Sequence, residues 1–251
     1  MNKHLHEVSY PLHIIFFLSL FFVEYTWMNA VGIIILWTLI GGYGVAVGYH
    51  RYYSHKSFET YPIIAKLLAY LGLMSADGSL PFWVALHRGV HHRWADKPQD
   101  LHSPIHGKWS AFIAWQRSIE PSKVSLLSAR DIMKDPYLVF LHENHNKIFW
   151  GTIGICAIIS WQFALGMLIP AILLSHHQDN LVNVVGHIPS MGYRNHNTDD
   201  NSVNNWFTGL FVWGQGWHNN HHHNAGSADF GNKWWEFDSS AKILIPLIRK
   251  R

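Results

Sequence analysis

The distribution of positive charge constrains this chain more than any other feature of its sequence. None of the 19 Lys and Arg residues lies between His4 and His50 or between Ile148 and Tyr193. Both of these segments are rich in apolar residues, and each is long enough for two helices that cross a bilayer core of about 30 Å. The sequence therefore predicts an all-α integral membrane protein with four transmembrane helices arranged as two hairpins.

Four apolar stretches fit the expected spans, at residues 11–27, 31–49, 148–161 and 163–185. Because segments rich in Lys and Arg stay on the cytoplasmic side, we expect both termini, residues 50–147 and residues 187–251 in the cytoplasm. In a bacterium the membrane would be the inner one. No linker divides the chain, so a single domain over residues 1–251 is expected, with a helical cytoplasmic cap. The alternative is a soluble protein with two buried helical hairpins.

The composition excludes several classes of protein. Charged residues make up 14% of the chain, against about 25% in an ordinary soluble domain. The apolar fraction of 49% excludes a disordered chain. The single cysteine, Cys156, excludes a disulfide framework and any cysteine-based zinc or iron–sulfur site. The net charge of +3 comes without a polybasic run, so nothing indicates a nucleic-acid partner.

The chain contains 20 histidines, an unusually large number, and some of them form three clusters beside the expected spans. The three clusters are H-R-Y-Y-S-H from His50 to His55, H-R-G-V-H-H from His87 to His92, and H-N-N-H-H from His218 to His222. Neutral imidazole is a good ligand for iron, copper, nickel and zinc. The eight imidazoles of these clusters exceed the four ligands of a structural zinc site. The sequence therefore predicts two metal ions on the cytoplasmic side.

Helical spacing predicts which of these imidazoles converge. Residues three or four apart share a face of an α-helix. This favours convergence of His87 with His91, and of His218 with its neighbours at positions 221 and 222. His50 and His55 are five apart, about 140° around an α-helix, so the pair must flank a metal or the helix must unwind locally.

Two classes of metal protein can be compared with these clusters. No cluster contains Glu, so the H-E-x-x-H motif of a membrane zinc protease is absent. A metal transporter or metal-binding membrane protein remains the non-enzyme alternative. Such a protein would be expected to place its ligands near the bilayer midplane, whereas these clusters lie beyond the ends of the expected spans.

The three clusters resemble the histidine boxes of the integral-membrane fatty acid desaturases, and more closely the stearoyl-CoA desaturase-like branch of bacterial type. Box order and spacing match, as do W-A-D-K-P-Q-D-L-H-S-P after the second box and K-W-W-E-F-D after the third. The resemblance covers roughly residues 30–240. It implies an O2-dependent enzyme with two Fe that introduces a cis double bond, of delta-9 type, into a long-chain acyl group. A di-iron hydroxylase of an acyl chain, lipid or hydrocarbon remains the alternative.

The resemblance also implies the ligands of the metal centre. In that branch an N-x-x-x-H segment supplies a ninth histidine and an Asn that reaches one metal through water; these match His187 and Asn183. The residue after Asn183 is Val184, where the branch usually has Ser. The implied ligand set is His50, His55, His87, His91, His92, His187, His218, His221 and His222, with Asn183 acting through water.

Eleven histidines fall outside this set. Eight are expected to be solvated or satisfied by local hydrogen bonds: His4, His6, His13, His102, His106, His142, His145 and His196. The other three, His176, His177 and His223, are ambiguous and receive no predicted role.

Substrate-binding residues are also implied by the resemblance. Trp83 matches a Trp that lies against the acyl chain near the reacting carbons, although a Trp at the membrane interface is the alternative. Counting back from the first box by helical turns gives Ala46, Gly42 and Thr38. The branch uses the positions of Gly42 and Thr38 to close the far end of its substrate tunnel. Close helix packing is the alternative explanation for small residues here.

The acyl headgroup and the electron donor stay open. Arg and Asp, which help to bind coenzyme A in that branch, are matched here by Ala85 and Leu86. Acyl-CoA, acyl-lipid and carrier-protein-linked substrates are therefore all retained. The chain contains no haem, flavin or nicotinamide motif, so we expect an external donor such as a ferredoxin, a flavoprotein reductase or a b-type cytochrome. Membrane lipids are the other expected partners.

Overall fold

A computed structural model describes residues 6–119 and 124–250, except for the side chains of residues 6 and 7, and its regular elements are all helical. Three isolated β-bridges join loops, at Thr60–Arg249, Tyr193–Asn204 and Asn204–Trp217. The predicted all-α fold class is therefore confirmed. His4 and the side chain of His6 lie outside the described residues.

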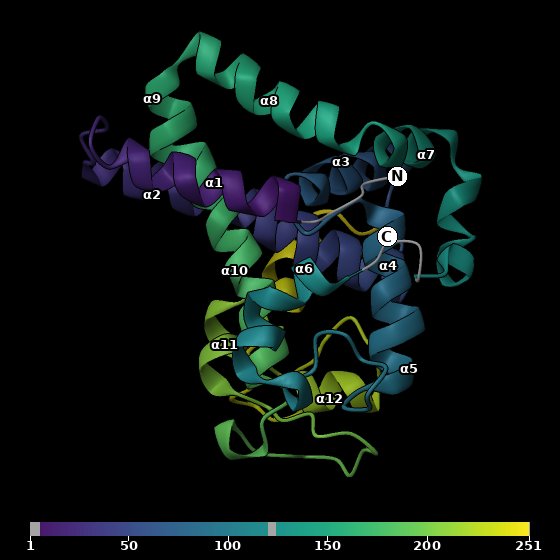
Figure 1. Ribbon diagram of the computed structural model, residues 1–251. Coiled ribbons are helices and arrows are strands. Elements are labelled where there is room, and N and C mark those ends of the chain that lie inside the picture. The colour runs from purple at the N-terminus through teal and green to yellow at the C-terminus, as the bar shows by residue number, and fades with distance from the viewer. Residues whose placement is uncertain (1–5, 120–123, 251) are drawn as a thin grey trace.

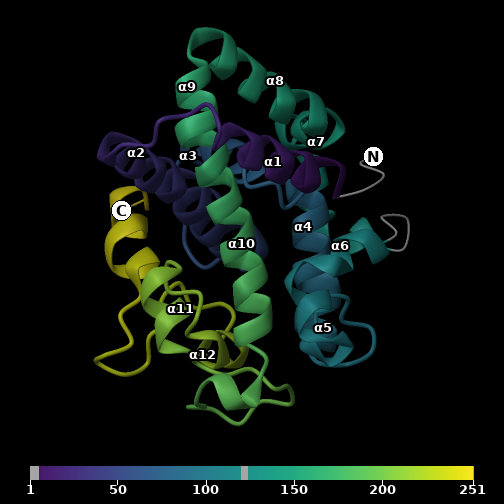
Figure 2. The ribbon, with the colours of Figure 1, turned by 60° about the vertical axis from the view of Figure 1, so that its left-hand side comes forward.

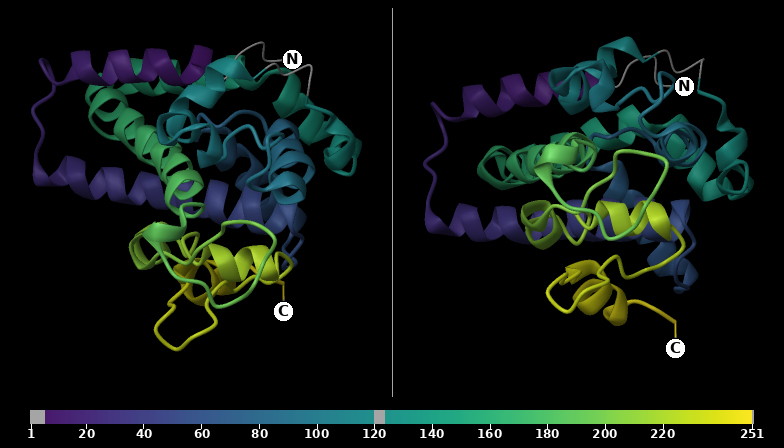
Figure 3. Two further views of the ribbon diagram at one scale, coloured as in Figure 1. Left: turned by 60° about the horizontal axis from the view of Figure 1, so that its bottom comes forward. Right: turned by 90° about the horizontal axis from the view of Figure 1, so that it is seen from below.

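Residues 6–54 form a long hairpin (Figure 3). After α1 (His6–Ser19), the chain turns over residues 20–26 and returns as α2 (Trp27–Trp37). The backbone N–H of Thr26 donates to Asn29 Oδ1 at 2.9 Å, which fixes the start of α2. Without a break, α2 continues into η1 (Thr38–Ser54), a wider helix with π-type hydrogen bonding. This hairpin covers the first two expected spans, although its first helix ends at Ser19 rather than at Trp27.

A second hairpin covers the other two expected spans. It consists of α8 (His145–Ile159), the short α9 (Trp161–Phe163), η8 (Ala164–Leu168) and α10 (Ile169–Val185). The turn lies at Ser160, whose Oγ accepts a hydrogen bond from the Phe163 N–H at 3.2 Å and so caps the returning helix. In Figure 2, α10 forms a column that runs from α9 toward α12.

Among the described residues, one helix is both long and apolar enough to cross a bilayer: Trp27–Ser54, with 28 residues. The other helices of the two hairpins are shorter or carry polar side chains, such as Gln178 and Asp179 on α10. Large apolar side chains are nevertheless exposed outside that helix, with Phe21 82% and Ile158 87% exposed. Exposed apolar surface of this kind marks contact with lipid or protein. Four membrane crossings remain a prediction.

The remaining elements are short helices; those around α5, α11 and α12 form a cap at the end of the molecule away from the α8–α9 turn, whereas α3 and α7 lie toward α8 (Figure 1). The elements before α8 are α3 (Pro62–Leu73), α4 (Leu80–Leu86), η2 (His87–His91), α5 (His92–Trp94), η3 (Pro104–His106), η4 (Ser110–Ala114), α6 (Trp115–Ser118), η6 (Leu126–Ala129), η7 (Ile132–Lys134) and α7 (Pro136–Glu143). Those after α10 are η9 (Pro189–Met191), α11 (Trp206–Phe211), α12 (His218–His223), η10 (Ser240–Leu244) and η11 (Ile245–Leu247).

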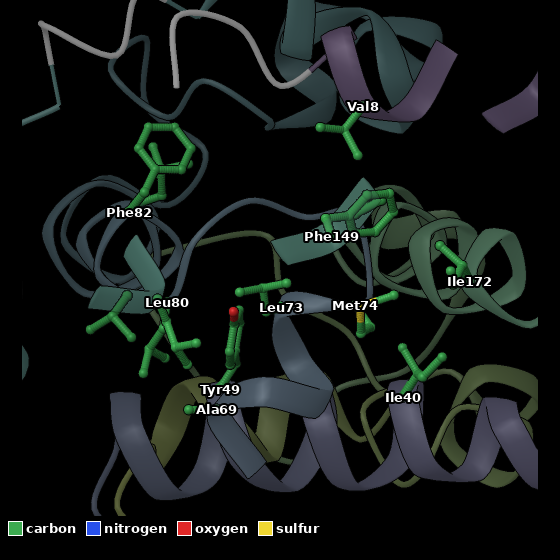
Figure 4. Packing of buried hydrophobic residues seen from close by; sticks show 14 of the residues in the cluster. Val8, Ile40, Tyr49, Ala69, Leu73, Met74, Leu80, Phe82, Phe149 and Ile172 are labelled. Carbon is green, nitrogen blue, oxygen red and sulfur yellow. The ribbon is translucent and has the colours of Figure 1, made fainter. Parts of the chain in front are cut away.

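One apolar core joins the hairpins to the helices that carry the histidines. Tyr49 of η1, Leu73 of α3, Phe149 of α8 and Ile172 of α10 are each at most 1% exposed and belong to one cluster (Figure 4). Burying a side chain of this size contributes about 1.5–3 kcal/mol. This core fixes η1, and with it the first histidine box, against the other elements.

Glycines allow η1 and α3 to pack at very short range. A Cβ atom on Gly44 would lie 2.5 Å from the backbone nitrogen of Gly72, and one on Gly72 would lie 2.3 Å from Tyr49 Cε1. Real side chains do not tolerate such contacts, so larger residues would push the two helices apart. Close packing therefore explains at least these small residues on η1 and α3.

Candidate metal centre

The structure brings the nine predicted histidines together in two adjacent groups. Site A contains His50, His55, His87, His92 and His221; site B contains His91, His187, His218 and His222. Within each group the facing ring nitrogens lie within 4.8 Å of one another. The side chains of the two groups come from η1 and the residue after it, from η2–α5, from the residues just after α10, and from α12.

Wide helical turns bring together residues that are five apart. The His55 N–H donates to the His50 carbonyl at 3.2 Å, and the two rings lie 5.0 Å apart. In η2 the His92 N–H likewise donates to the His87 carbonyl, and the Nε2 atoms of these residues are 3.0 Å apart. Because π-type turns bond residue i to i+5, each pair lies on one face and both pairs contribute to site A.

The prediction that His87 and His91 converge on one point is wrong for the same reason. His91 follows the wide turn on a different face and belongs to site B. α12 is an ordinary α-helix, so His218 pairs with His222 in site B, with 3.1 Å between their Nε2 atoms, while His221 joins site A. Consecutive histidines in the second and third boxes therefore supply one imidazole to each site.

Carboxylates orient three of the four imidazoles of site B. The Nδ1 atoms of His91, His187 and His222 lie 3.0, 2.8 and 2.8 Å from carboxylate oxygens. The respective partners are Asp100, Asp96 and Asp200. An ionised carboxylate only accepts hydrogen bonds, so each Nδ1 carries the proton and each Nε2 is left with a free lone pair. Metal-binding histidines are typically held in this way.

The Nε2 atoms of site B face one another at short range. The distances are 3.2 Å for His91–His222, 3.1 Å for His222–His218 and 3.0 Å for His187–His218. When both rings are neutral, no proton is left between the Nε2 atoms of His91 and His222, so their lone pairs repel unless a proton or a metal cation lies between them. Metal–nitrogen bonds of about 2.0–2.1 Å at right angles separate neighbouring ligands by about 3 Å. The donor set therefore fits a metal ion.

In site A a carboxamide, that of Gln215, orients the His50 ring. His50 Nδ1 donates to Gln215 Oε1 at 2.9 Å, which turns its Nε2 toward His221 Nε2 at 2.9 Å. The remaining short contacts between Nε2 atoms are 2.8 Å for His55–His87 and 3.0 Å for His92–His221. Five imidazoles thus converge without any carboxylate among them.

Burial favours the neutral, metal-binding form of two of these imidazoles, His55 and His222. It lowers the pKa of His55 to about 3 and that of His222 to about 4. At neutral pH both rings are uncharged and keep a lone pair for a metal. Burial alone would raise the pKa of Asp100, but the facing His91 and His102 outweigh it and hold that pKa below its usual range.

Sequence reasoning missed the groups that orient the imidazoles. Asp96 and Asp100 belong to the W-A-D-K-P-Q-D segment that follows the second box, so a signal was present in the sequence without an assigned role. Gln215 belongs to G-Q-G-W-H-N-N-H-H, the third box with the residues before it, but received no role, and Asp200 lies in no recognised motif. His102 was expected to be solvated or locally satisfied. Instead it is 7% exposed, its ring stacks on His91 at 4.9 Å, and its Nδ1 has no hydrogen-bond partner within residues 6–119 and 124–250.

A buried ion pair anchors site A to the C-terminal segment. Arg51 and Asp238 are both fully buried, with Nη2 and Oδ2 2.8 Å apart. Arg51 also donates through Nη1 to Gln215 Oε1 at 2.9 Å, so the ion pair holds the group that orients His50. Its guanidinium lies 3.8 Å above the Phe230 ring. Asp238 is the last residue of the K-W-W-E-F-D segment.

Trp83 and Asn183 lie beside site A. Both line a small pocket of about 40 Å³ together with His87. The Trp83 ring stacks on the His87 ring at 4.8 Å, and its Nε1 donates to Asp179 Oδ2 at 3.2 Å. A polar pocket of this size has room for ordered water.

Thr38, Gly42 and Ala46 lie on η1 and are not among the residues that line this pocket. A Cβ atom on Gly42 would be 3.1 Å from Leu244 and 3.3 Å from the Trp213 ring. Gly42 therefore faces the C-terminal segment at contact distance. Ala46 is fully buried, and its carbonyl accepts a hydrogen bond from Arg51 at 2.9 Å.

Comparison with known proteins gives a consistent result. The family model for fatty acid desaturase matches residues 25–250. The sn-1 stearoyl-lipid 9-desaturase of Synechocystis is 31% identical over 231 residues, which cover 90% of this chain and 71% of the relative. The sn-1 stearoyl-lipid 9-desaturase of Anabaena variabilis is 32% identical over 86% of this chain and 79% of the relative. Delta-9 acyl-lipid desaturase 2 of Arabidopsis thaliana is 32% identical over 95% of this chain and 77% of the relative.

Proposed function

This chain belongs to the fatty acid desaturase family and is an oxidoreductase that desaturates fatty acyl chains; we propose that it works with two iron ions, one in site A and one in site B. The metal assignment rests mainly on the histidines of site B. Their Nε2 atoms face one another at about 3 Å, while the Nδ1 atoms of three of them are held by Asp96, Asp100 and Asp200. Imidazole-rich sites suit iron among other transition metals, and desaturation of an unactivated chain needs an O2-derived oxidant.

When bound, the two irons would supply the redox chemistry that reduces O2 and removes hydrogen from two adjacent methylene groups. The protein holds nine imidazoles in place and shields most of their surface from water. Their partners lie on loops of the cap, so the cap orients the ligands that the helices carry. Asn183 is proposed to reach one metal through water in the pocket that it lines with His87.

Trp83 is proposed to position the acyl chain beside site A. Its ring is held on one side by the His87 stack and at its edge by Asp179, so it has one fixed orientation. A fixed aromatic wall next to the ligands limits which carbons can approach them. Thr38, Gly42 and Ala46 are proposed to bound the far part of the chain on η1. Trp83→Ala should then scatter the double-bond position while bound iron stays constant.

The substrate class favoured here is an acyl chain carried by a membrane lipid. Ala85 and Leu86 stand where the stearoyl-CoA branch has charged residues, and they are buried with exposures of 1% and 4%. Two buried apolar side chains offer nothing to a coenzyme A phosphate. The cited relatives are named for stearoyl-lipid or acyl-lipid substrates and for position 9, which supports a delta-9 lipid desaturase.

The membrane arrangement is proposed as four crossings with the cap on the cytoplasmic side. Three features support it: the helix Trp27–Ser54, the exposed apolar side chains of α1 and α8, and the absence of Lys and Arg from residues 4–50 and 148–193. The metal sites would then lie at the cytoplasmic end of the bundle, close to the surface where electrons arrive.

The decisive experiment is product and metal analysis of the purified protein. Iron-loaded enzyme in lipid nanodiscs, given O2 and dithionite-reduced ferredoxin, should convert stearoyl phospholipid to a product two hydrogens lighter, with two irons per chain. A product heavier by one oxygen would make the protein a hydroxylase. Zinc in place of iron, with no product, would overturn the di-iron proposal. Stearoyl-CoA and stearoyl carrier protein, supplied in parallel, test the headgroup.

A further inference from the structure

The side of α11 that faces away from the rest of the protein is apolar. Four large side chains lie there, with exposures between 42% and 62%: Trp206, Phe207, Leu210 and Phe211. The opposite side carries Thr208 and Gly209, which are buried. A helix on a protein surface in water usually shows the reverse order, with polar side chains outward. The exposed side of α11 is therefore suited to an apolar environment.

The loop that precedes α11 has the opposite character. Residues 194–201 read R-N-H-N-T-D-D-N, and none of the eight is buried. Both segments belong to residues 187–251, which the charge pattern places in the cytoplasm. The polar loop agrees with that expectation, whereas the outward face of α11 does not. The boundary between water and an apolar environment therefore falls between this loop and α11.

α11 borders a groove whose opposite wall belongs to the expected spans. The groove has a volume of about 290 Å³, with Phe207 and Phe211 on one side and Trp37 and Leu174 on the other. Trp37 is part of the helix that is long and apolar enough to cross a bilayer, and Leu174 of α10 is exposed. Figure 2 shows α11 beside the half of α10 that is nearer α12. The apolar surface of α11 thus continues the surface of the spans.

A second element carries an exposed tryptophan to the same stretch of α10. Trp109, just before η4, is 69% exposed, and its ring lies 6.2 Å from that of Phe112. Phe112 lines the groove and stacks on His177 of α10 at 5.4 Å. Tryptophan is enriched where a membrane meets water. Trp109 and Trp206 therefore mark the level of that interface on two elements that flank α10.

The polar side chains in the groove wall have no atom left for a ligand. Gln178 Oε1 accepts from the Nε1 atoms of Trp37 and Trp213 at 2.6 and 3.1 Å, and its Nε2 donates to a backbone carbonyl at 3.0 Å. His177 Nε2 pairs with His13 Nε2 at 2.9 Å, and its Nδ1 is buried. What the groove offers to a ligand is apolar contact alone, which suits an alkyl chain.

We propose that α11 and the start of η4 lie in the membrane–water interface nearest the metal centre, and that the groove they line holds an acyl chain of a bilayer phospholipid. The inference rests on the proposed function, because it takes the two hairpins to lie in the bilayer. The metal sites then lie just outside the bilayer core. His187 of site B follows Leu181 of the groove wall by six residues, about 9 Å along an α-helix.

A lipid explains this surface better than a protein partner does. Trp37 and Leu174 belong to expected spans, so a protein that filled the groove would itself have to enter the bilayer. α11 carries no ionisable side chain, whereas the docking of an electron-donor protein is steered by complementary charges. An acyl chain is already present at that depth and requires only the apolar contacts that the groove provides.

Probes on single cysteines test the depth of α11. In a Cys156→Ser background, Trp206→Cys reports the interface and Phe211→Cys reports the groove, each labelled with the fluorophore NBD in phosphatidylcholine nanodiscs. Lipid brominated along its acyl chains should quench both probes at least about threefold more strongly than a probe on Asp199→Cys, because an interfacial helix buries its apolar face among acyl chains. Asp199 is the control because it is exposed in the polar loop.

A probe on Ile34→Cys separates the two proposals, because Ile34 is exposed on the spanning helix. If brominated lipid quenches this probe but leaves both α11 probes as weakly quenched as the one on Asp199→Cys, the inference is wrong and the membrane arrangement stands. Quenching at Trp206→Cys without quenching at Phe211→Cys would show that no lipid enters the groove and would overturn that part. No quenching at Ile34→Cys would overturn the membrane arrangement itself.

Discussion

Sites A and B lie side by side but are built in different ways. Site B takes its geometry from carboxylates: three of its four imidazoles donate to Asp96, Asp100 and Asp200. Site A takes its geometry from helix winding, because the π-type turns of η1 and η2 bring together residues five apart. The partner of His50 in site A is the neutral Gln215.

This difference shows where each site is vulnerable. Removal of a single carboxylate should loosen one ligand of site B and leave the backbone unchanged. Site A should respond instead to changes that disturb η1 or the segment that anchors it. The consecutive histidines of α12 couple the two sites, since His221 serves site A and His222 serves site B.

The largest effect is expected from two of the three consecutive histidines at the end of α12, and the third serves as the control. His221→Ala should empty site A and His222→Ala should empty site B, and each should reduce activity to background because both metals are needed. His223 is exposed and belongs to neither site, so His223→Ala is the matched control. Iron analysis and product yield measure all three. Full activity of either ligand variant would contradict the two-metal assignment.

The next largest effect is on stability and concerns the anchor of site A. Asp238→Asn leaves the Arg51 charge buried without its partner, which should cost about 3–5 kcal/mol of unfolding free energy. The control is Asp229→Asn, which removes the surface ion pair with Lys242 and should cost at most about 1 kcal/mol. Urea unfolding in detergent micelles gives both values. Equal losses would show that the buried pair is no anchor.

A smaller effect should separate the two sites. Asp200→Ala removes the carboxylate partner of His222, and loss of such a partner typically weakens metal binding about 10–100-fold. Only the iron of site B should become easier to remove with a chelator, while the other stays. Asp199→Ala is the control, because Asp199 is exposed and contacts no ligand by its side chain. Release of both irons at one rate would show that the sites are not independent.

The smallest effect concerns a surface ion pair next to the first two boxes. Asp131 binds Arg88 at 2.9 Å and Lys56 at 2.8 Å. Burial alone would raise the pKa of Asp131, but these two cations outweigh it and lower that pKa to about 2. The stabilisation is therefore complete above pH 4 and is lost as the pH falls toward 2. Because these groups are partly exposed, it is at most about 1 kcal/mol.

Comparison of wild type with Asp131→Asn by urea unfolding at pH 6 and pH 3 measures that contribution. The difference in unfolding free energy should be present at pH 6 and smaller at pH 3. A difference that grows as the pH falls would contradict the ion-pair explanation.

Composition and spacing were sufficient for the fold class and for eight of the nine histidines, because both depend on local patterns, whereas His187 was implied only by the resemblance to the desaturases. Apolar segments without Lys or Arg indicated both hairpins, and the clustering of His residues indicated the three boxes. The partition into two sites was not predictable in the same way. A rule of 3.6 residues per turn paired His87 with His91, whereas the wide turn of η2 pairs His87 with His92.

The amino-acid sequence by itself determined that this chain is helical and carries three histidine boxes, since charge placement and residue spacing are properties of the chain alone. Only the tertiary structure decided which imidazole faces which, because that depends on backbone winding and on partners distant in sequence. Asp200 orients His222 from 22 residues away, and Asp238 anchors Arg51 from 187 residues away. Such pairs form when the cap folds over the helices, and no local pattern records them.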